Sequence, residues 1–190
     1  MSLPRIAVLI LIAALLGGCA SGPPLQFYTL TPEAGTSRGT LRVPIQIAAV
    51  HIPAALDRQA LVRYLAPTHL QLAVAARWAG PLDEMIADVL TRDLQTRLGI
   101  RNVILPSAAT PPHTQRIVVN ILHFAPDASG TVNFEGSWSA VHNERPTVTY
   151  PLQLSTREAA AGSADEVQAQ AMSRALGQVA DALAAQLSGS

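Results

Sequence analysis

The single cysteine of this 190-residue chain, Cys19, is the feature that most limits how the chain can fold. A protein with one cysteine cannot form an internal disulfide, a CxxC redox pair or a multi-thiolate metal site. The folded domain must therefore be stabilised by its hydrophobic core alone. Hydrophobic residues make up 49% of the chain, which is enough to build such a core.

Cys19 directly follows the longest apolar run of the chain. Before it stand a positive start with Arg5, an apolar stretch over residues 6–16, and the small residues Gly17 and Gly18. These are the parts of a secretory signal. The apolar stretch is too short to cross about 30 Å of hydrocarbon as a helix. We therefore interpret residues 1–18 as a signal peptide that is removed, and not as a permanent anchor.

The sequence Leu16-Gly17-Gly18-Cys19 resembles the lipobox of bacterial lipoproteins. In those proteins the cysteine sulfur receives diacylglycerol, the chain is cut before the cysteine, and the new amino group is acylated, for example with palmitate. The resemblance implies that Cys19 is lipidated and that residues 19–24 are a tether before a domain over residues 25–190. Three acyl chains would hold the protein on a membrane stably, because each buried methylene contributes about 0.8 kcal/mol. The alternative is a plain signal peptide with a chance cysteine.

Residue 20 is alanine and not aspartate. By analogy with the enterobacterial sorting rule, this favours the outer membrane, facing the periplasm, over the inner membrane. The chain has 13 basic and 13 acidic residues, and every basic residue is an arginine. Nucleic-acid binding depends on clustered basic residues, so no nucleic-acid partner is expected. The length after removal of the signal suits one domain.

Two segments have the three- and four-residue apolar spacing of amphipathic helices. The first begins at Pro81, has Asp83 and Glu84 in its first turn, and ends at Gly99. Its apolar stripe consists of Leu82, Met85, Ile86, Val89, Leu90, Leu94 and Leu98. The second begins at a capping box over residues 163–166. Its stripe consists of Val167, Met172, Leu176, Val179, Leu183 and Leu187.

Alternation and β-branched or aromatic content predict strands over residues 26–30, 41–52, 61–64, 70–75, 102–105, 116–124, 131–140 and 147–154. Segments 61–64 and 70–75 form a predicted hairpin, and the last three segments form an antiparallel meander. Within 131–140 one side is apolar, and the other is expected to meet water or a partner through Asn133, Glu135, Ser137 and Ser139. Together these elements predict a single α/β domain with a mixed or mainly antiparallel sheet and two amphipathic helices on one face.

The sequence offers no local signature of catalysis. No two of the five histidines, at 51, 69, 113, 123 and 142, have a spacing that starts a metal site. Residues 136–140, GSWSA, have Trp138 where the GxSxG elbow requires its serine. Neither phosphate-binding glycine motif is present. The acidic pairs at 83–84 and 165–166 are explained by helix dipoles. We therefore predict that the protein has no catalytic residue, metal or cofactor, and that it is not an enzyme.

Three stretches together resemble the PqiC-like family of ABC-type transport auxiliary lipoproteins. They are Gln26 to Leu30, Val50 to Val62 and Arg77 to Leu82, in this order behind the lipobox. Within them Asp57, Arg58 and Trp78 are candidates either for partner contact or for a structural role. Trp78 is read first as a core residue between strand and helix.

The resemblance implies an auxiliary subunit that works beside a mammalian-cell-entry (MCE) domain protein and its ABC or membrane components. It would act in docking and assembly of a system that transports lipid between the two membranes. In this way it would support envelope integrity. Assembly of several copies of this chain into a homo-oligomer is a further possibility. One alternative is a periplasmic lipid carrier that holds an acyl chain between sheet and helices. Another is a hydrolase that uses polar residues around Trp138, such as Ser137 and Ser139.

Overall fold

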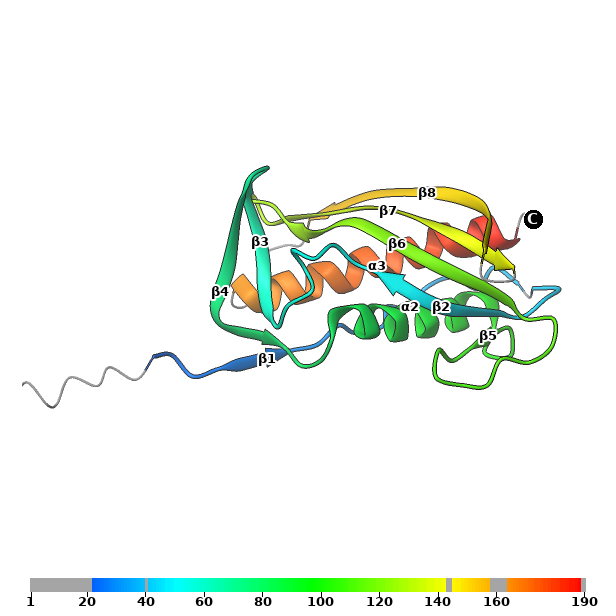
Figure 1. Cartoon of the computed structure of the whole chain (residues 1–190). Helices are drawn as coiled ribbons and strands as arrows, with labels where there is room; N and C mark the ends of the chain where they lie inside the picture. Colours follow the sequence, from blue (N-terminus) through cyan, green and yellow to red (C-terminus); the bar gives the residue numbers. More distant parts are fainter. Residues whose placement is uncertain (1–21, 40, 143–144, 158–163, 189–190) are drawn as a thin grey trace, which may run out of the picture.

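The computed structural model describes residues 22–39, 41–142, 145–157 and 164–188. Figure 1 shows the elements of this part of the chain. In order they are β1 (Gln26–Tyr28), β2 (Ile45–His51), β3 (Ala60–Ala66), β4 (His69–Trp78), α2 (Leu82–Leu98), β5 (Val103–Ile104), β6 (Gln115–Pro126), β7 (Thr131–His142), β8 (Arg145–Arg157) and α3 (Ala164–Ser188).

The strands are divided between two sheets. The larger sheet has the order β5-β2-β6-β7-β8, and the smaller has the order β1-β4-β3. In the larger sheet β5, β2 and β6 run parallel, while β6, β7 and β8 form the predicted antiparallel meander. In the smaller sheet β1 is parallel to β4, and β3 and β4 form the predicted hairpin. The mixed sheet is therefore confirmed.

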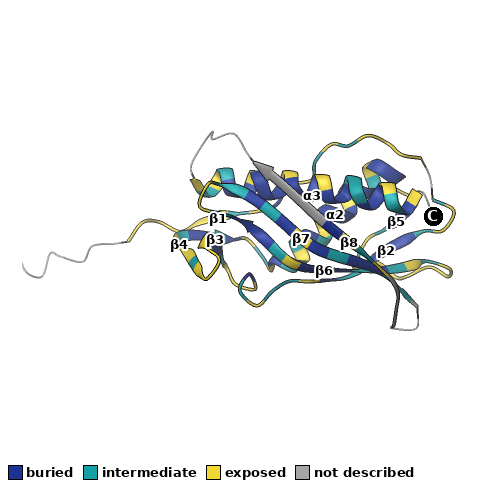
Figure 2. Cartoon of the chain, turned by 90° about the horizontal axis from the view of Figure 1, so that it is seen from above, coloured by how far each residue is buried: buried dark blue, intermediate teal, exposed yellow. Residues whose placement is uncertain are grey.

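The helices α2 and α3 lie side by side against one face of the five-stranded sheet (Figure 1). The layer between them is filled by side chains with almost no exposed surface, among them Phe124, Phe134, Leu90, Leu94 and Leu183. Burial of each such side chain contributes about 1.5–3 kcal/mol. Figure 2 shows buried and exposed residues alternating along both helices, as expected for amphipathic helices. The predicted fold class is confirmed.

The ends of α2 agree with the sequence signals. Pro81 immediately precedes the helix, and Asp83 and Glu84 stand in its first turn. Gly99 follows the helix with φ at 89°, a left-handed conformation that glycine adopts without strain. The predicted apolar stripe is buried except for half-buried Met85. Ser163 of the predicted capping box of α3 lies outside the described residues.

The strand β2 is shorter than predicted. It begins at Ile45, directly after Pro44, and its pairing with β6 shifts register between Ile47 and Ala49. Proline cannot donate to a ladder, which explains why regular pairing begins only after it. β5 is reduced to two residues. As a result β5 covers only the first part of the outer edge of β2.

The inward side of β7 forms the aromatic part of the core. Phe134 packs edge-on against Phe124, with ring centroids 5.5 Å apart. Trp138 stacks on Tyr150 at 4.5 Å, and its indole N–H donates to Gln186 Oε1 at 2.6 Å. These contacts confirm that Phe134 and Trp138 face the core, and they satisfy the polar group of the tryptophan. None of the helices in the described ranges is both long and apolar enough to cross a membrane.

Candidate docking surfaces

The three stretches that the sequence analysis singled out meet at one corner of the small sheet. Tyr28 of the first stretch is in register with Trp78 of the third, and the Tyr28 carbonyl accepts a hydrogen bond from Ala79 N at 2.8 Å. The Trp78 N–H donates to the carbonyl of Gln59, in the second stretch, at 2.7 Å. We call this corner the motif junction. The hydrogen bonds that join the three stretches to one another here run between backbone groups, which gives the motif junction a structural role.

Trp78 is only 3% exposed, which assigns it to the core and leaves no surface for a partner. Arg77 beside it has a structural role as well. Its guanidinium donates to the carbonyl oxygens of Ala73, Val74 and Ala76 at 2.9–3.1 Å. These carbonyls belong to the stretch of β4 where the pairing with β3 is irregular. Arg77 therefore replaces hydrogen bonds that the ladder does not provide.

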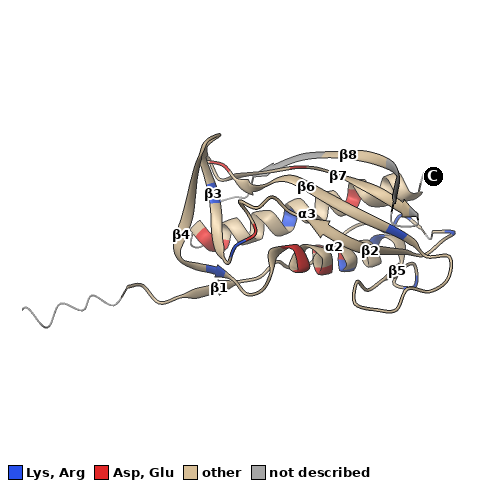
Figure 3. Ribbon diagram, in the orientation of Figure 1, with Lys and Arg blue, Asp and Glu red and all other residues tan. Residues whose placement is uncertain are grey.

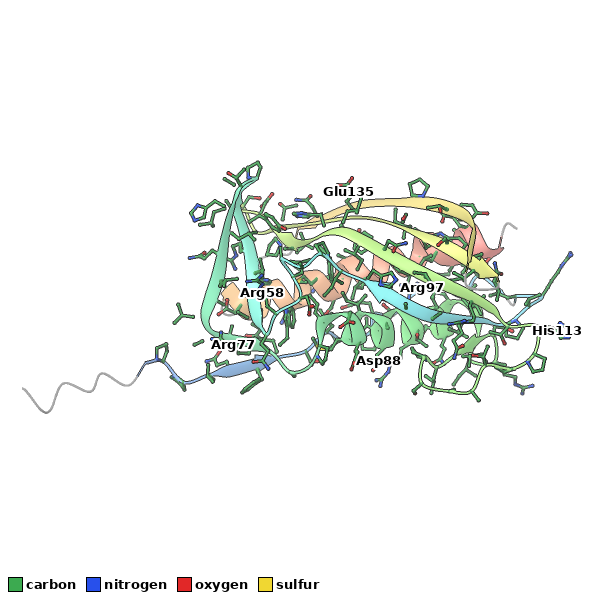
Figure 4. All side chains as sticks on the ribbon, in the orientation of Figure 1. Arg58, Arg77, Asp88, Arg97, His113 and Glu135 are labelled. Carbon is green, nitrogen blue, oxygen red and sulfur yellow. The ribbon has the colours of Figure 1, made fainter. Side chains whose placement is uncertain are left out.

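Asp57 and Arg58 are exposed in the turn between β2 and β3. The turn is closed by hydrogen bonds from Leu56 N and Asp57 N to the carbonyl of Pro53. Arg58 makes one side-chain hydrogen bond within the turn, to the Ala54 carbonyl at 3.3 Å. Figure 4 shows Arg58 beside β3 and Arg77 at the base of β4. Asp57 and Arg58 are thus placed where a partner could reach them, unlike Trp78.

A buried arginine ties the N-terminal segment to both helices. Arg97 in α2 is 1% exposed and donates from Nε to Asp181 Oδ1 in α3 at 2.8 Å. Its Nη1 donates to the Glu33 carbonyl at 3.3 Å, and its Nη2 to the Gly177 carbonyl at 3.0 Å. Figure 4 labels Arg97 in the interior of the domain. The segment over residues 29–38 is therefore held in place by these contacts. The local sequence did not predict them.

Asp93 completes this network. Its Oδ1 accepts the Glu33 N–H at 2.7 Å and lies 4.0 Å from Arg97 Nη1. Its Oδ2 has no hydrogen-bond partner among the residues that the structure describes. Burial raises the pKa of Asp93 to about 6, against the opposing effects of the Glu33 N–H and of Arg97. A shifted carboxyl can mark a catalytic site, but here its neighbours are backbone groups and an ion-paired arginine.

The described residues contain no group of three or more histidine, cysteine, aspartate or glutamate side chains placed to hold a metal ion. Of the five histidines, His123 contacts the ring of Tyr64, with centroids 4.5 Å apart. The serines proposed for hydrolysis lack a neighbouring histidine across the strands. Ser137 pairs with Asn120 and Pro151, and Ser139 pairs with Val118 and Thr149.

The polar side of β7 lies on the face of the larger sheet opposite the helices. Glu135 is exposed on it, Asn133 and Ser137 are half-buried, and Ser139 is buried. Figure 4 shows Glu135 pointing away from the helices. This face is a candidate contact surface.

The described part of the domain has at least two hollows of ligand-binding size. An apolar hollow of about 590 Å³ lies between the tip of the β3–β4 hairpin and the β6–β7 turn, with Tyr64, Leu65, Pro67, His123 and Ala128 in its lining. A second hollow of about 650 Å³ lies between β2 and the first turns of α2. We call it the edge groove. It is lined by Ile47–His51, by Asp83, Glu84, Ala87 and Asp88, and by Pro106 and Ser107.

Cys19 and the residues Leu16, Gly17 and Gly18 of the predicted lipobox lie outside the described residues. The first described residue, Gly22, follows Cys19 by three positions, and β1 begins at Gln26. An extended chain spans at most about 3.6 Å per residue, so Cys19 is within about 25 Å of β1.

Comparisons with known proteins identify relatives over most of the chain. A family model described as the ABC-type transport auxiliary lipoprotein component matches residues 28–184. A crystal structure titled only as an uncharacterized protein is 18% identical, with a TM-score of 0.68, and the match covers 87% of this chain and 99% of that one. Protein XCC0632 from Xanthomonas campestris, of the DUF330 family, is also 18% identical, with a TM-score of 0.65 and coverage of 86% and 96%. No curated protein matches.

Proposed function

The chain belongs to the ABC-type transport auxiliary lipoprotein family, and from this premise we propose that it is a docking and assembly subunit of an MCE-type lipid transport system. Family membership makes it a membrane-anchored lipoprotein of the cell envelope, associated with ABC-type transport. The finer proposal is that it stands beside an MCE-domain protein, assists lipid movement between the two membranes and so supports envelope integrity. In this role the protein contributes binding surfaces for other subunits. The energy for transport comes from a separate ATPase where the system has one.

The proposal includes lipidation. We propose that the chain is cut after Gly18 and that Cys19 carries the acyl chains. The described chain then emerges from the tether directly into β1, which is paired with β4 at the motif junction. A tether of this length keeps the domain within tens of ångströms of its membrane. Ala20 favours the outer membrane over the inner one, with the domain in the periplasm.

The observation that carries the docking role is where the domain places its polar and exposed groups. Its buried titratable residues, Arg97 and Asp93, hold the fold together. The polar groups that a partner could contact are exposed. They are Asp57 and Arg58 in the β2–β3 turn, Glu135 on the open sheet face, and the acidic residues of the edge groove. A subunit that binds other proteins needs such surfaces and needs no reactive centre.

The first test is crosslinking of the acylated protein in its native membranes, followed by identification of its neighbours by mass spectrometry. A Cys19→Ser form serves as the control for the lipid anchor. We expect an MCE-domain protein among the neighbours of the wild type and its loss from those of the control. Recovery of no transport component would contradict the docking role.

A lipid carrier remains the second candidate because of the apolar hollow near Tyr64. A volume of about 590 Å³ lies within the usual size of a ligand pocket. Its place differs from the one predicted, because the layer between sheet and helices is filled by buried side chains such as Phe124 and Leu183. Ala128→Trp would fill the hollow. Native mass spectrometry should then show less copurified lipid than for the wild type, and a lipid-free wild type would count against this candidate.

A further inference from the structure

Part of one edge of the larger sheet is unpaired. β5 pairs only with Ile45 and Gln46, whereas β2 continues to His51. Within the ranges that the structure describes, no strand pairs with residues 47–51 on that side. Such an edge presents backbone N–H and C=O groups that a further strand can bind.

Specific contacts keep this edge open. The buried Gln46 side chain donates from Nε2 to the carbonyl oxygens of Leu105 and Ala108, at 2.9 and 3.0 Å. Its Oε1 accepts a hydrogen bond from Thr110 Oγ1 at 2.5 Å. Pro106 has no backbone N–H with which to extend the β5 ladder. The loop after β5 is thus held by Gln46. Pro106 and Ser107 line the edge groove, but they do not pair with residues 47–51 of β2.

The edge groove has room for a second backbone. Its β2 wall includes Ala48 and Ala49, and its α2 wall includes Ala87, so the side chains there are small. Alternate residues of an added strand would face this wall. Strand addition to an open sheet edge is a recurring way in which proteins bind extended peptides.

The helix wall of the edge groove is acidic. Asp83, Glu84 and Asp88 line it, and Glu84 and Asp88 are exposed. The ion pairs found in the described part of the chain join Arg97 to Asp93 and Asp181, so they include none of these three carboxylates. Figure 3 shows these acidic residues on the N-terminal part of α2. A basic partner would complement them.

The opposite edge of the sheet is different. It is formed by β8, which contains Pro146 and Pro151. Prolines on an edge strand prevent a further strand from pairing regularly. The open stretch of β2, Ile47-Ala48-Ala49-Val50-His51, has neither a proline nor a lysine, arginine or acidic residue to block pairing. Of these two edges, the one on β2 is therefore better suited to pair with an added strand.

We propose that the edge groove binds an extended segment of a partner polypeptide, which adds to β2 as a further strand and sets lysine or arginine side chains against Asp83, Glu84 and Asp88. The inference deepens the proposed docking function and rests on it, because it names the surface and the chemistry of the segment bound. A second copy of this chain would be a different occupant.

The test uses the acylated full-length protein in its native membranes. With Cys19 acylated, a cysteine introduced at Ala87 is the only free thiol, and so is one introduced at Glu135. The two positions lie on opposite sides of the domain, since α2 covers one face of the sheet and Glu135 points from the other (Figure 4). We expect a thiol-directed photo-crosslinker, which requires no particular side chain on the partner, to join A87C, but not E135C, to a lysine- or arginine-containing segment of a transport component.

Two further measurements define how the segment binds. Partner binding should slow hydrogen exchange at least tenfold for those amides of residues 47–51 that point to the open edge and not toward β6, because an added strand protects them. The double variant E84K/D88K should reduce the copurified partner about tenfold, whereas E166K, a charge reversal at an exposed position of α3, should leave it unchanged. Thermal unfolding of both variants checks that they are folded.

The outcomes separate this inference from the proposed function. If the wild type recovers the transport component but only E135C crosslinks to it, the edge groove is the wrong surface and the docking function stands. If A87C crosslinks to a second copy of this chain, the proposed occupant is wrong. If the wild type recovers no transport component, the docking function itself fails.

Discussion

Asp93 and Arg97 stand one turn apart in α2, and both project into the interior, where Asp93 accepts the N–H of Glu33 and Arg97 donates to the Glu33 carbonyl. The pair thus holds both polar groups of one residue in the N-terminal segment. Through Asp181 and the Gly177 carbonyl, Arg97 also reaches α3. One arginine therefore connects three separate parts of the chain.

Replacement of Arg97 by methionine should lower the free energy of unfolding by about 3–5 kcal/mol, as is typical when one partner of a buried ion pair is removed. Methionine fills similar space, but it takes the Arg97 donors away from the Asp181 carboxylate and from the carbonyl groups of Glu33, Asp93 and Gly177. Chemical denaturation measures the change. Arg92→Ala is the matched control on the exposed side of the same helix and should change stability by less than about 0.5 kcal/mol. Equal effects of the two substitutions would refute the role of Arg97.

Asp93 should make stability depend on pH. Its pKa is raised from 3.8 to about 6 in the folded protein. Between these values the folded state holds a proton that the unfolded chain has released, so the contribution of Asp93 to the free energy of unfolding falls as pH rises. Asp93→Asn should remove this slope. Melting temperatures from pH 4 to 7 test it, and parallel curves for the two proteins would contradict it.

Gly136→Ala should destabilise the larger sheet by about 1–3 kcal/mol, the usual cost of overpacking. A Cβ at Gly136 would collide with the backbone oxygen of Asn120 in β6. That oxygen belongs to the main chain of a paired strand and cannot move aside alone. Gly80→Ala is the control, because nothing lies within 4 Å of a Cβ there. Thermal unfolding of both variants should show the difference, and an unchanged melting temperature for Gly136→Ala would argue against this packing.

Gln46→Ala should release the loop after β5 without unfolding the domain. It removes the hydrogen bonds to Leu105, Ala108 and Thr110. We expect hydrogen exchange in residues 105–110 to speed up about tenfold while exchange in β6 stays slow. Faster exchange throughout the sheet would mean instead that Gln46 supports the whole fold.

The regular elements could be predicted because their signals are local. The stripe from Leu82 to Leu98, the turn at Gly99 and the alternation around Phe134 and Trp138 each depend on residues close together in sequence. The core position of Trp78 was also predicted. These signals define an element and its buried side, and so the fold class follows from them.

The network around Arg97 could not be predicted in this way. Asp93 and Arg97 are charged, and the pattern of α2 places them beside an apolar stripe, where solvent exposure is the usual expectation. They are buried because residues 29–38 lie over them, a contact across some sixty positions of sequence. The edge groove was missed for a similar reason. It depends on where β5 stops, and that is decided by the contacts of Gln46 with a distant loop.

The path of the N-terminal segment has a mechanical consequence. A pulling force applied at Gly22 acts first on β1, whose parallel pairing with β4 resists it along the strand. Any force that passes β1 reaches Thr31, Glu33 and Arg38, which are bonded to Ser173, Asp93 and Arg97 of the two helices. A force on the membrane anchor is thereby transmitted to the buried hydrogen bonds between this segment and the two helices. The N-terminal segment therefore resists detachment from the domain.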